Sequence, residues 1–430
     1  MSYASPGRRQ VAVIGAGVAG LTAAYLLQRE SDVTLYEAQD RLGGHAHTHD
    51  VIAGGRSLAV DSGFIVHNER EYPMLCRLFR ELGVATMPSE MSMSVRCEGC
   101  GLAYAGGRGL AGIVASPSVG HRRSYLAMLA QVPLFYRHAR ELLADNANGA
   151  AAASPDLTLG EFLSAGRYST YFVRHFAVPL VSAVWSCGPQ AVTDYPALYL
   201  FTFLAQHGML QVRRSASWRT VRGGSRCYVE AVAKELHAVR TSAPVRAVSR
   251  RARGAAIRDE ADIIREFDAV VIAAHADQAL QILDEPTVAQ RTVLGAFRYS
   301  RNETVLHTDG SELPRRRGAR ASWNYVQTSC VQSCGRVHVS YDMNRLQRLG
   351  AADPLVVTLN GGQRIRPEQV LASMVYEHPI YTPAAVAAQA GLPALSDGVL
   401  AFAGAYHGWG FHEDGCRSGV AAAQSLGVTW

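Results

Sequence analysis

The stretch VAVIGAGVAGLTAAYLLQRESDVTLYEAQDRLGGH, residues 11–45, decides the fold. Residues 11–14 are all apolar, which is typical of a parallel strand buried on both faces. Three glycines follow at the spacing G-x-G-x-x-G, and residues 21–30 carry apolar side chains at helical spacing. Residues 32–37 predict a second strand, which ends in Glu37. The segment therefore predicts a strand, a helix and a second parallel strand.

Each glycine of the motif has its own physical role in a dinucleotide site. Gly15 permits the tight turn, Gly17 lets a pyrophosphate approach the backbone, and Gly20 lets helix and strand pack closely. The helix N-terminus offers unpaired N–H groups and a favourable dipole to the phosphates. Glu37 can accept hydrogen bonds from the ribose hydroxyls of an adenosine. A lone G-x-G-x-x-G is weak evidence, but with both strands, the helix and the terminal acid it predicts a dinucleotide site.

The residues that follow indicate which dinucleotide binds. Residues 37–44 have the pattern E-A-x-x-R-x-G-G, and VDSGFIVHN comes at residues 60–68. This continuation resembles the FAD-binding opening of the flavin amine oxidase and phytoene desaturase superfamily. In that family the arginine and the paired glycines run along the ribityl-phosphate side, and the equivalent of DSGFIV passes against the isoalloxazine. The resemblance implies FAD as the cofactor.

Later motifs resemble the remaining pieces of the same FAD domain. They are VRGGSR at 221–226, APVRAVSRR at 243–251, FDAVVIAAHADQ at 267–278, FAGA at 402–405 and GFHEDG at 410–415. The last piece resembles a helix whose N-terminus points at the flavin pyrimidine ring. The cofactor contacts that the resemblance implies are Gly15, Ala16, Gly17, Val18, Ala19, Gly20, Glu37, Ala38, Arg41, Gly43, Gly44, His45, Asp61, Gly63, Phe64, Ile65, Val245, Ala273, Gly404, Phe411 and His412.

At 430 residues the chain is long enough for two domains. We expect an α/β fold with a Rossmann-like FAD-binding domain assembled from residues 1–89, 213–297 and 395–430. Residues 90–212 and 298–394 would form an α+β substrate domain, as in the two-domain amine oxidases. The first of these inserts is rich in aromatic and aliphatic residues at helical spacing, and the second alternates as strands do.

The C-terminal stretch FAGAYHGWGFHEDG, residues 402–415, could also hold a divalent metal. His407, His412, Glu413 and Asp414 are all potential ligands. Helix capping and flavin contact already explain the two acids, however, because acids suit the first turn of a helix. We therefore expect no metal at this end of the chain.

The eight cysteines are scattered along the chain. Cys97 and Cys100 could join Cys330 and Cys334 in a four-thiolate zinc site, but the second spacing is atypical and the segments are distant. The segment CEGCGLAYAGG predicts a hairpin and lacks the helix N-terminus that a redox C-x-x-C requires. We therefore expect no metal. No secretory signal is evident before the first strand, so reduced thiols in a cytoplasmic protein are the expectation.

The charge pattern excludes some partners. A net charge of +6 is mild for this length, and no nucleic-acid recognition motif accompanies it, so we expect no nucleic-acid partner. No stretch approaches the roughly twenty uninterrupted apolar residues of a membrane span. The basic and apolar segment at residues 122–140 could rest on a membrane surface, which leaves peripheral membrane contact open.

Departures from the amine oxidases bear on the chemistry. Many family members hold a lysine near flavin N5, on a strand close to RNETVLHTD at residues 301–309, but the only lysine here is Lys234. Covalently flavinylated members place a cysteine before an aromatic residue, whereas Ile380 precedes Tyr381 here, so the FAD should be non-covalent. The aromatic pair that holds an amine would be Tyr381 and Phe411, and the phenylalanine makes that cage less polar.

The function that we expect is FAD-dependent oxidation or desaturation of an apolar, lipid-like small molecule, with His412 and Tyr381 as candidate bases. The motifs VDSGFIVHNEREYP, SWRTVRGGSR, SWNY, MNRLQ and GFHEDG resemble a bacterial subgroup associated with cyclopropane-type fatty-acyl modification. Three alternatives remain. They are an amine oxidase, a flavin-dependent double-bond isomerase, and a non-catalytic flavoprotein that partners a neighbouring fatty-acyl-modifying enzyme.

Overall fold

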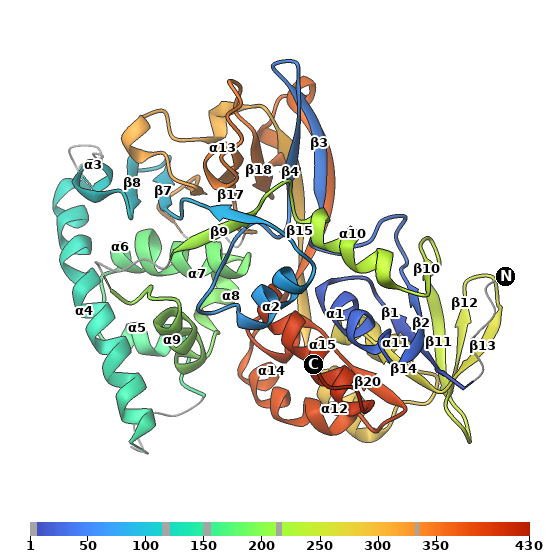
Figure 1. Ribbon diagram of the computed structural model, residues 1–430. Coiled ribbons are helices and arrows are strands. Elements are labelled where there is room, and N and C mark those ends of the chain that lie inside the picture. Colours follow the sequence, from blue (N-terminus) through green and yellow to red (C-terminus); the bar gives the residue numbers. More distant parts are fainter. Residues whose placement is uncertain (1–6, 114–120, 149–155, 212–216, 332–334) are drawn as a thin grey trace.

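A computed structural model of the protein describes residues 7–113, 121–148, 156–211, 217–331 and 335–430 (Figure 1). Two large sheets organise it. A five-stranded parallel sheet has the order β10-β2-β1-β14-β20, and a seven-stranded mixed sheet has the order β19-β15-β18-β17-β16-β7-β8. The first sheet and its helices lie on the right of Figure 1, and the second sheet lies with the longest helix on the left.

The parallel sheet gathers strands from distant parts of the chain. Its central strand β1 pairs with β2 on one side and with β14 on the other, and the apolar side chains of all three strands are almost entirely buried. This burial explains why the strands are nearly continuous apolar runs. The strands are β10 (Ala238–Arg240), β2 (Ser31–Tyr36), β1 (Arg9–Ile14), β14 (Ala269–Ile272) and β20 (Leu400–Phe402).

Two helices that are far apart in the sequence cross closely beside this sheet. They are α1 (Val18–Leu27) and α15 (His412–Ser425), which belong to one hydrophobic cluster. A Cβ on Gly419 would lie 2.4 Å from the carbonyl oxygen of Ala19, so only glycine permits the approach. The crossing brings both helix N-termini to the edge where β1 ends.

The remaining elements of this half are short. Two small antiparallel sheets, β11-β12-β13 and β5-β9-β6, and the hairpin β3-β4 accompany four helices. Their bounds are β3 (Thr48–Ala53), β4 (Arg56–Asp61), β5 (His67–Asn68), β6 (Thr86–Pro88), β9 (Trp218–Val221), β11 (Val245–Arg250), β12 (Ala255–Asp259), β13 (Ile264–Phe267), α2 (Pro73–Glu81), α10 (Arg226–Glu235), α11 (Ala276–Ile282) and α12 (Val288–Leu294).

The seven-stranded sheet carries a layer of helices on one side (Figure 1). Only its β16–β7 pair is parallel. Its strands are β7 (Met93–Cys97), β8 (Leu102–Gly106), β15 (Arg298–His307), β16 (Trp323–Gln327), β17 (Val339–Asp342), β18 (Val356–Leu359) and β19 (Val370–Ile380). The helices of this half are α3 (Gly109–Ile113), α4 (Arg122–Ala147), α5 (Leu159–Ala165), α6 (Thr170–Phe172), α7 (Val178–Trp185), α8 (Pro189–Thr193), α9 (Ala197–Gln206) and α13 (Met343–Leu346), while α14 (Pro383–Ala388) packs near α12.

Each large sheet draws its strands from a separate set of ranges. Those of the parallel sheet fall within residues 1–89, 213–297 and 395–430, and those of the mixed sheet fall within 90–212 and 298–394. These are the ranges that the sequence assigns to the two expected domains. The exact boundaries stay a prediction.

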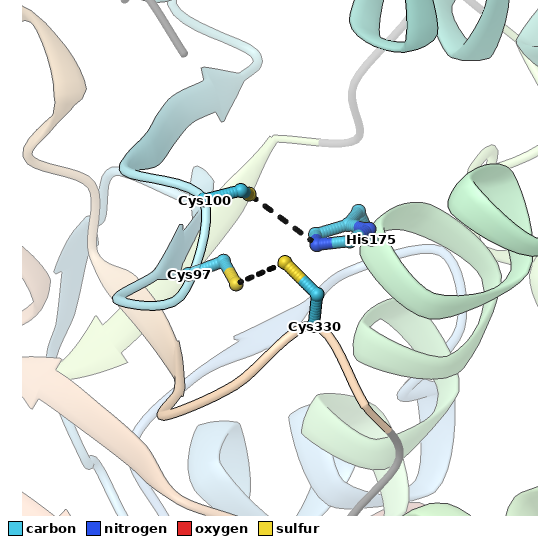
Figure 2. Close-up of side chains that lie close together, drawn as sticks. All are labelled: Cys97, Cys100, His175 and Cys330. Carbon is cyan, nitrogen blue, oxygen red and sulfur yellow. Dashed lines mark hydrogen bonds between the residues drawn. The ribbon is translucent and has the colours of Figure 1, made fainter. Parts of the chain in front are cut away.

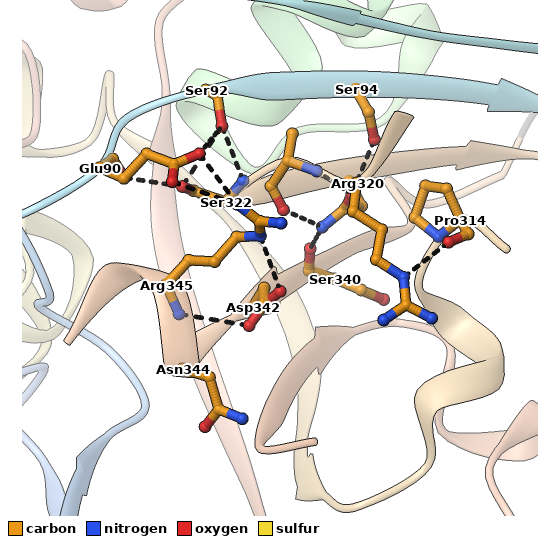
Figure 3. A network of polar contacts seen from close by, with 12 residues as sticks. Glu90, Ser92, Ser94, Pro314, Arg320, Ser322, Ser340, Asp342, Asn344 and Arg345 are labelled. Atoms are coloured by element: carbon orange, nitrogen blue, oxygen red, sulfur yellow. Dashed lines mark hydrogen bonds and ion pairs between the residues drawn. The ribbon is translucent and has the colours of Figure 1, made fainter. Parts of the chain in front are cut away.

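A buried polar network joins the strands at the middle of the mixed sheet (Figure 3). Ser94 on β7 donates to the side-chain oxygen of Asn324 on β16 at 2.7 Å, and Asn324 in turn donates to the carbonyl of Ser340 on β17 at 3.1 Å. At the edge of the network Arg345 pairs with Glu90 at 3.1 Å. Because buried polar groups must find partners, this network fixes the alignment of the three strands.

The helix α4 forms the outer edge of the second half (Figure 1). One face buries Tyr125, Met128, Phe135 and Ala139, while Leu126 is 64% exposed. Among the described residues, no helix combines the length and the apolar character needed to cross a lipid bilayer.

Candidate functional site

A single cavity of about 1290 Å³ connects the N-terminal glycine motif with the interior of the second half. Ordinary ligand pockets have volumes of roughly 300–1,000 Å³, so this one is unusually large. Its walls include the ends of β1, β2 and β14, the N-termini of α1 and α15, and residues of α4, α7 and α9. The cavity therefore spans both the expected cofactor site and the expected substrate domain.

Most of the predicted cofactor contacts lie on the wall of this cavity. The exceptions are Gly20, Gly43 and Asp61, which lie behind the wall. The predicted contacts on the wall are Gly15, Ala16, Gly17, Val18, Ala19, Glu37, Ala38, Arg41, Gly44, His45, Gly63, Phe64, Ile65, Val245, Ala273, Gly404, Phe411 and His412. The structure thus brings together residues that are up to about 400 positions apart.

The glycine motif has the geometry that a pyrophosphate requires. Gly15 has a φ of +97°, and a Cβ there would lie 2.5 Å from the carbonyl oxygen of Ala273. A Cβ on Gly20 would lie 1.8 Å from the carbonyl oxygen of Gly15, so helix and turn are in direct contact. A Cβ on Gly17 would meet nothing within 4 Å, because this residue faces the cavity. The open space at Gly17, beside the start of α1, fits a dinucleotide phosphate.

Glu37 and Arg41 are both held by the backbone of the turn they flank. The Glu37 carboxylate accepts the backbone N–H of Ala16 at 2.8 Å and that of Gln39 at 2.9 Å. Each carboxylate oxygen keeps a further lone pair, so ribose hydroxyls still find an acceptor. Arg41 donates to the carbonyl of Gly44 at 2.8 Å, which fixes the paired-glycine turn. The glycine motif, Glu37 and Arg41 together form what we call the dinucleotide cradle, and these contacts shape its adenosine and phosphate ends.

Asp61 connects three segments behind the cavity wall. Its carboxylate accepts the hydroxyl of Thr48 at 2.6 Å, the hydroxyl and backbone N–H of Ser225 at 2.8 and 2.9 Å, and the side-chain amide of Gln347 at 2.9 Å. Burial raises the pKa of Asp61 to about 6, although the bonds from Thr48 and Ser225 oppose the shift. The structure places this residue in the framework that supports the cradle, away from the cavity surface.

The two acids of GFHEDG serve two different helices. Asp414 accepts the backbone N–H of Phe411 at 3.0 Å and pairs with Arg417 at 2.8 Å, so it caps its own helix as expected. Glu413 instead accepts the backbone N–H groups of Met74 and Leu75, both at 3.0 Å, at the start of α2. Burial raises the pKa of Glu413 to about 7 and that of Asp414 to about 6. Both acids thus have structural partners.

His412 begins α15 and lies on the cavity wall. Its ring stacks on Phe64 with centroids 3.7 Å apart and planes inclined by 14°. Its Nε2 lies 3.4 Å from the Tyr228 hydroxyl. Burial lowers the pKa of His412 to about 3, so the ring is neutral at physiological pH. A cation here would also oppose the positive end of the helix dipole.

Tyr381 does not reach the cavity wall. Its side chain is fully buried, and its hydroxyl lies where a Cβ on Gly410 would approach to 2.9 Å. The other member of the expected aromatic pair, Phe411, is on the wall, where it stacks on Phe203 with centroids 4.7 Å apart. Tyr381 and Phe411 therefore do not face each other across the cavity, and the role predicted for Tyr381 has no support from its placement.

Three histidines lie together at the junction of the two halves: the sequence indicated His45 as a cofactor contact, but His275 and His378 were not singled out. His45 and His378 have ring centroids 5.2 Å apart, and His275 stacks on Tyr299 at 4.3 Å. Asn302 donates its side-chain N–H to Nδ1 of His378 at 3.0 Å, so a neutral His378 carries its proton on Nε2. His275 directly follows the apolar run AVVIAA of residues 269–274, and the carboxyl end of a buried parallel strand is a position where α/β proteins place ligand-binding residues. This position in the sequence was the signal that could have identified His275 as a site residue.

Electrostatics keep these histidines neutral. Burial, and then the neighbouring His378 and His275, lower the pKa of His45 well below its usual value. Burial and the neighbouring His275 lower the pKa of His378 to about 4. The group therefore offers uncharged hydrogen-bonding atoms, including a buried His45 Nε2 that has no protein partner. An orphaned buried nitrogen of this kind on a cavity wall is suited to contact a bound molecule.

Comparison with known protein families finds a match for this chain. The family described as flavin containing amine oxidoreductase matches residues 18–307. The chain belongs to this family. AofH of Mycobacterium tuberculosis, a candidate flavin-containing monoamine oxidase, is 27% identical over 260 residues, which cover 58% of this chain and 53% of AofH. The flavin-dependent L-tryptophan oxidase RebO of Lentzea aerocolonigenes is 45% identical over 60 residues, which cover 14% and 13%. The match to AofH thus spans about half the length of AofH.

Solved structures of other enzymes share the fold. Cyclohexylamine oxidase from Brevibacterium oxydans superposes with a TM-score of 0.69 at 17% identity, covering 97% of this chain and 98% of its own. A fatty acid isomerase from P. acnes that produces CLA superposes with a TM-score of 0.67 at the same identity and coverage. The α/β two-domain architecture expected from the sequence is confirmed, and FAD is the cofactor that the family implies.

Two features of the cavity bear on its chemistry. Lys234 lies on α10 and is not among the described residues that line the cavity. The second half of the cavity is an apolar chamber, lined by Leu129, Val132, Pro133, Tyr136, Phe176, Leu180, Ala183, Val184, Trp185 and Phe203. Among the described wall residues of the whole cavity, the acids are Glu37, in the adenosine part, and Glu377, on β19.

Proposed function

We propose that the protein is an FAD-dependent oxidoreductase that takes a hydride from an apolar, lipid-like substrate, through desaturation or oxidation of a fatty-acyl chain. The observation that carries the proposal is the continuity of the cavity, in which a dinucleotide cradle opens into a chamber with apolar walls. Burying a methylene group contributes about 0.8 kcal/mol, so such a chamber favours a hydrocarbon chain. The fatty acid isomerase that shares this fold supports a fatty-acyl ligand in an enzyme of this shape.

FAD held by the glycine motif, Glu37 and Arg41 would supply two-electron oxidation, accepting the hydride of a substrate C–H bond while the adjacent carbon loses a proton to a base and a double bond forms. The residues of the chamber exclude water and hold the chain near the flavin. Phe411 and Trp185, whose ring centroids are 6.2 Å apart, line the chamber next to His412, which we keep as the candidate base.

We place the entrance to the chamber beside α4. Ile113 and Pro133 both line the cavity and are exposed to solvent, and Arg122 and Arg123 are exposed at the start of α4. Exposed arginines beside an apolar opening suit the acidic surface of a membrane, from which an acyl chain could pass directly into the chamber. A peripheral position on a membrane, and a neighbouring fatty-acyl-modifying enzyme as partner, belong to the same proposal.

Amine oxidation is the second candidate, and the family membership favours it. An ammonium substrate requires a carboxylate or an aromatic cage. Tyr381, one half of the expected cage, is fully buried, and among the described wall residues Glu377 is the acid besides Glu37 of the adenosine part. These features make an apolar substrate the better fit.

The deciding experiment follows the visible flavin band under anaerobic conditions while candidate substrates are added to the purified holoprotein. We expect bleaching by long-chain fatty acids or phospholipid vesicles and none by primary amines. Bleaching by amines alone would overturn the proposal in favour of amine oxidation. A product of unchanged mass with a moved double bond, and no net bleaching, would identify an isomerase. Absence of any turnover would identify a non-catalytic flavoprotein.

Neighbouring positions on α4 provide a matched pair of variants. Leu129 lines the chamber, whereas Ala130 is exposed to solvent. Leu129→Trp fills part of the chamber, and displacing about two methylene groups of the acyl chain costs about 1.6 kcal/mol of binding, so the rate of flavin reduction at low lipid concentration should fall about tenfold. Ala130→Trp adds the same side chain outside the chamber and should leave that rate unchanged. Equal rates in the two variants would show that the acyl chain binds elsewhere.

A further inference from the structure

Three cysteines and a histidine meet on the side of the second half away from the glycine motif. Cys97 ends β7 and Cys100 follows in the turn that leads to β8, while Cys330 lies on the loop after β16. His175 comes from the π-helical turn Val173–Ala177, which leads into α7. Figure 2 shows all four side chains pointing toward one another, from three separate segments. Their ligand atoms all lie within 4.8 Å of one another.

The spacing of these atoms matches a tetrahedral zinc site. With Zn–S bonds of about 2.3 Å and a Zn–N bond of about 2.0–2.1 Å, a tetrahedron has S–S edges of about 3.8 Å and S–N edges of about 3.6 Å. The sulfurs of Cys97 and Cys330 are 3.6 Å apart, and the sulfur of Cys100 is 3.7 Å from Nε2 of His175. Both distances agree with the expected edges to within a few tenths of an ångström.

The histidine is held in the tautomer that a metal requires. Its Nδ1 lies 3.0 Å from the backbone carbonyl oxygen of Tyr171, to which it must donate because a carbonyl only accepts. The lone pair of Nε2 therefore faces the sulfurs. Metal-binding histidines are oriented in this way by a second hydrogen bond. The π-helical turn supports the same conclusion, since such turns occur frequently at functional sites.

The surroundings suit a closed, structural site. Cys97 is fully buried, His175 is 1% exposed and Cys100 is 2% exposed, while Cys330 is half-buried. Arg174 donates to the carbonyl of Cys330 at 2.9 Å, and its positive charge would offset the single net negative charge of a Zn²⁺ ion with three thiolates. The loop also approaches the hairpin closely, because a Cβ on Gly99 would lie 2.9 Å from the backbone nitrogen of Cys330.

We propose that Cys97, Cys100, His175 and Cys330 bind a structural zinc ion. Three thiols lose their protons to the solvent on binding, and no electron is transferred. A set of three thiolates and one imidazole in a tetrahedron selects zinc among the common divalent ions. Cysteine spacing alone led to the opposite expectation, because it required Cys334 as the fourth ligand. That residue lies outside the described part of the chain, and His175 takes the fourth position.

The ion would fasten the edge of the mixed sheet to the helices of the chamber. It would join the β7–β8 turn, the loop after β16 and the helical segment that continues into α7. Leu180, Ala183, Val184 and Trp185 of α7 line the apolar chamber, so the site would anchor that wall at the beginning of the helix. This inference depends only on the cluster, and it holds whichever substrate the chamber takes.

The test measures metal in the intact holoprotein, purified without added metal or chelator. Elemental analysis should find about one zinc per chain. A thiol-modifying mercurial should release that zinc to a colorimetric chelator. The conservative variant Cys330→Ser changes a half-buried ligand and should lower zinc affinity about tenfold or more. Cys76→Ser, at a half-buried cysteine on α2, is the matched control and should retain the zinc.

Cobalt provides a second readout that does not depend on the stability of any variant. Protein refilled with Co²⁺ should show the visible ligand-field bands of a tetrahedral thiolate site, at longer wavelengths than the flavin bands. Folded protein that contains no zinc and takes up neither Zn²⁺ nor Co²⁺ would overturn the proposal. A disulfide between Cys97 and Cys330 in protein prepared without oxidant would overturn it as well, and so would equal zinc contents in Cys330→Ser and Cys76→Ser.

Discussion

Two glycines of the same motif should separate cofactor binding from folding. A Cβ on Gly17 would meet no protein atom within 4 Å, so Gly17→Ala should fold normally. Its φ of −70° is accessible to alanine, and replacing a glycine N-cap by alanine costs at most about 1 kcal/mol. A Cβ on Gly20 would lie 1.8 Å from the carbonyl oxygen of Gly15 and 3.2 Å from Cβ of Ala273. Overpacking of this kind costs about 1–3 kcal/mol or more, so Gly20→Ala should unfold at clearly lower denaturant.

The assay compares urea unfolding of the flavin-free proteins with and without added FAD. A ligand at one hundred times its dissociation constant stabilises the folded state by about 2.7 kcal/mol, and this gain should appear in the wild type and vanish in Gly17→Ala. The methyl group occupies the space that a pyrophosphate needs at the start of α1. If Gly17→Ala gained the same stability from FAD as the wild type, the cradle would not be the binding site. If it unfolded like Gly20→Ala, the space at Gly17 would not be open.

Three further predictions concern buried polar groups, each measured by urea unfolding of the flavin-free chain. Asp61→Asn replaces an acceptor oxygen by a donor and leaves a buried donor unpaired, so the free energy of unfolding should fall by about 2–4 kcal/mol; a loss below about 1 kcal/mol would contradict the network. The pKa of His378 is about 4 in the folded chain and about 6.5 in the unfolded one, so the unfolded state binds more protons between these values and stability falls as pH drops. His378→Gln should remove about 2.5 kcal/mol of the loss between about pH 7.5 and pH 4.5, and equal pH slopes in both proteins would contradict a neutral buried ring. Glu413→Ala leaves two N–H groups at the start of α2 unpaired and should cost about 1–3 kcal/mol; the surface variant Glu69→Ala should cost almost nothing.

The cofactor half of the molecule could be predicted from the sequence because its signals are local. The turn at Gly15, the helix start at Gly17 and the acid at Glu37 lie within one strand–helix–strand unit, and each has a physical requirement that only certain residues meet. The capping role of Asp414 is also local, because it acts three residues away within its own helix. Patterns of this kind are complete before any tertiary contact forms.

The features that sequence reasoning missed depend on contacts between distant segments. Asp61 is part of the motif VDSGFIVHN, but its partners include Gln347, which lies 286 positions away. The sequence therefore did not show that Asp61 links segments behind the cavity wall. Tyr381 directly follows β19, whose residues 375–379 line the cavity, yet its own side chain is buried in the core. His175 is 75 positions from Cys100, and a π-helical turn has no clear sequence signature. The sequence therefore did not reveal which distant side chains meet, nor into which space a side chain at the end of a strand or helix points.

The strand order of the parallel sheet has a consequence for how the protein is made. β14 pairs with β1 on one side and with β20 on the other, and β20 begins only at residue 400. Ribosomes add about 5–20 residues per second, so roughly 6–26 s separate the synthesis of β14 from that of β20. Throughout that interval one edge of β14 stays unpaired and α15 is missing from the cradle. Flavin capture must then follow the synthesis of α15, and the nascent chain has to protect an apolar strand edge until β20 emerges.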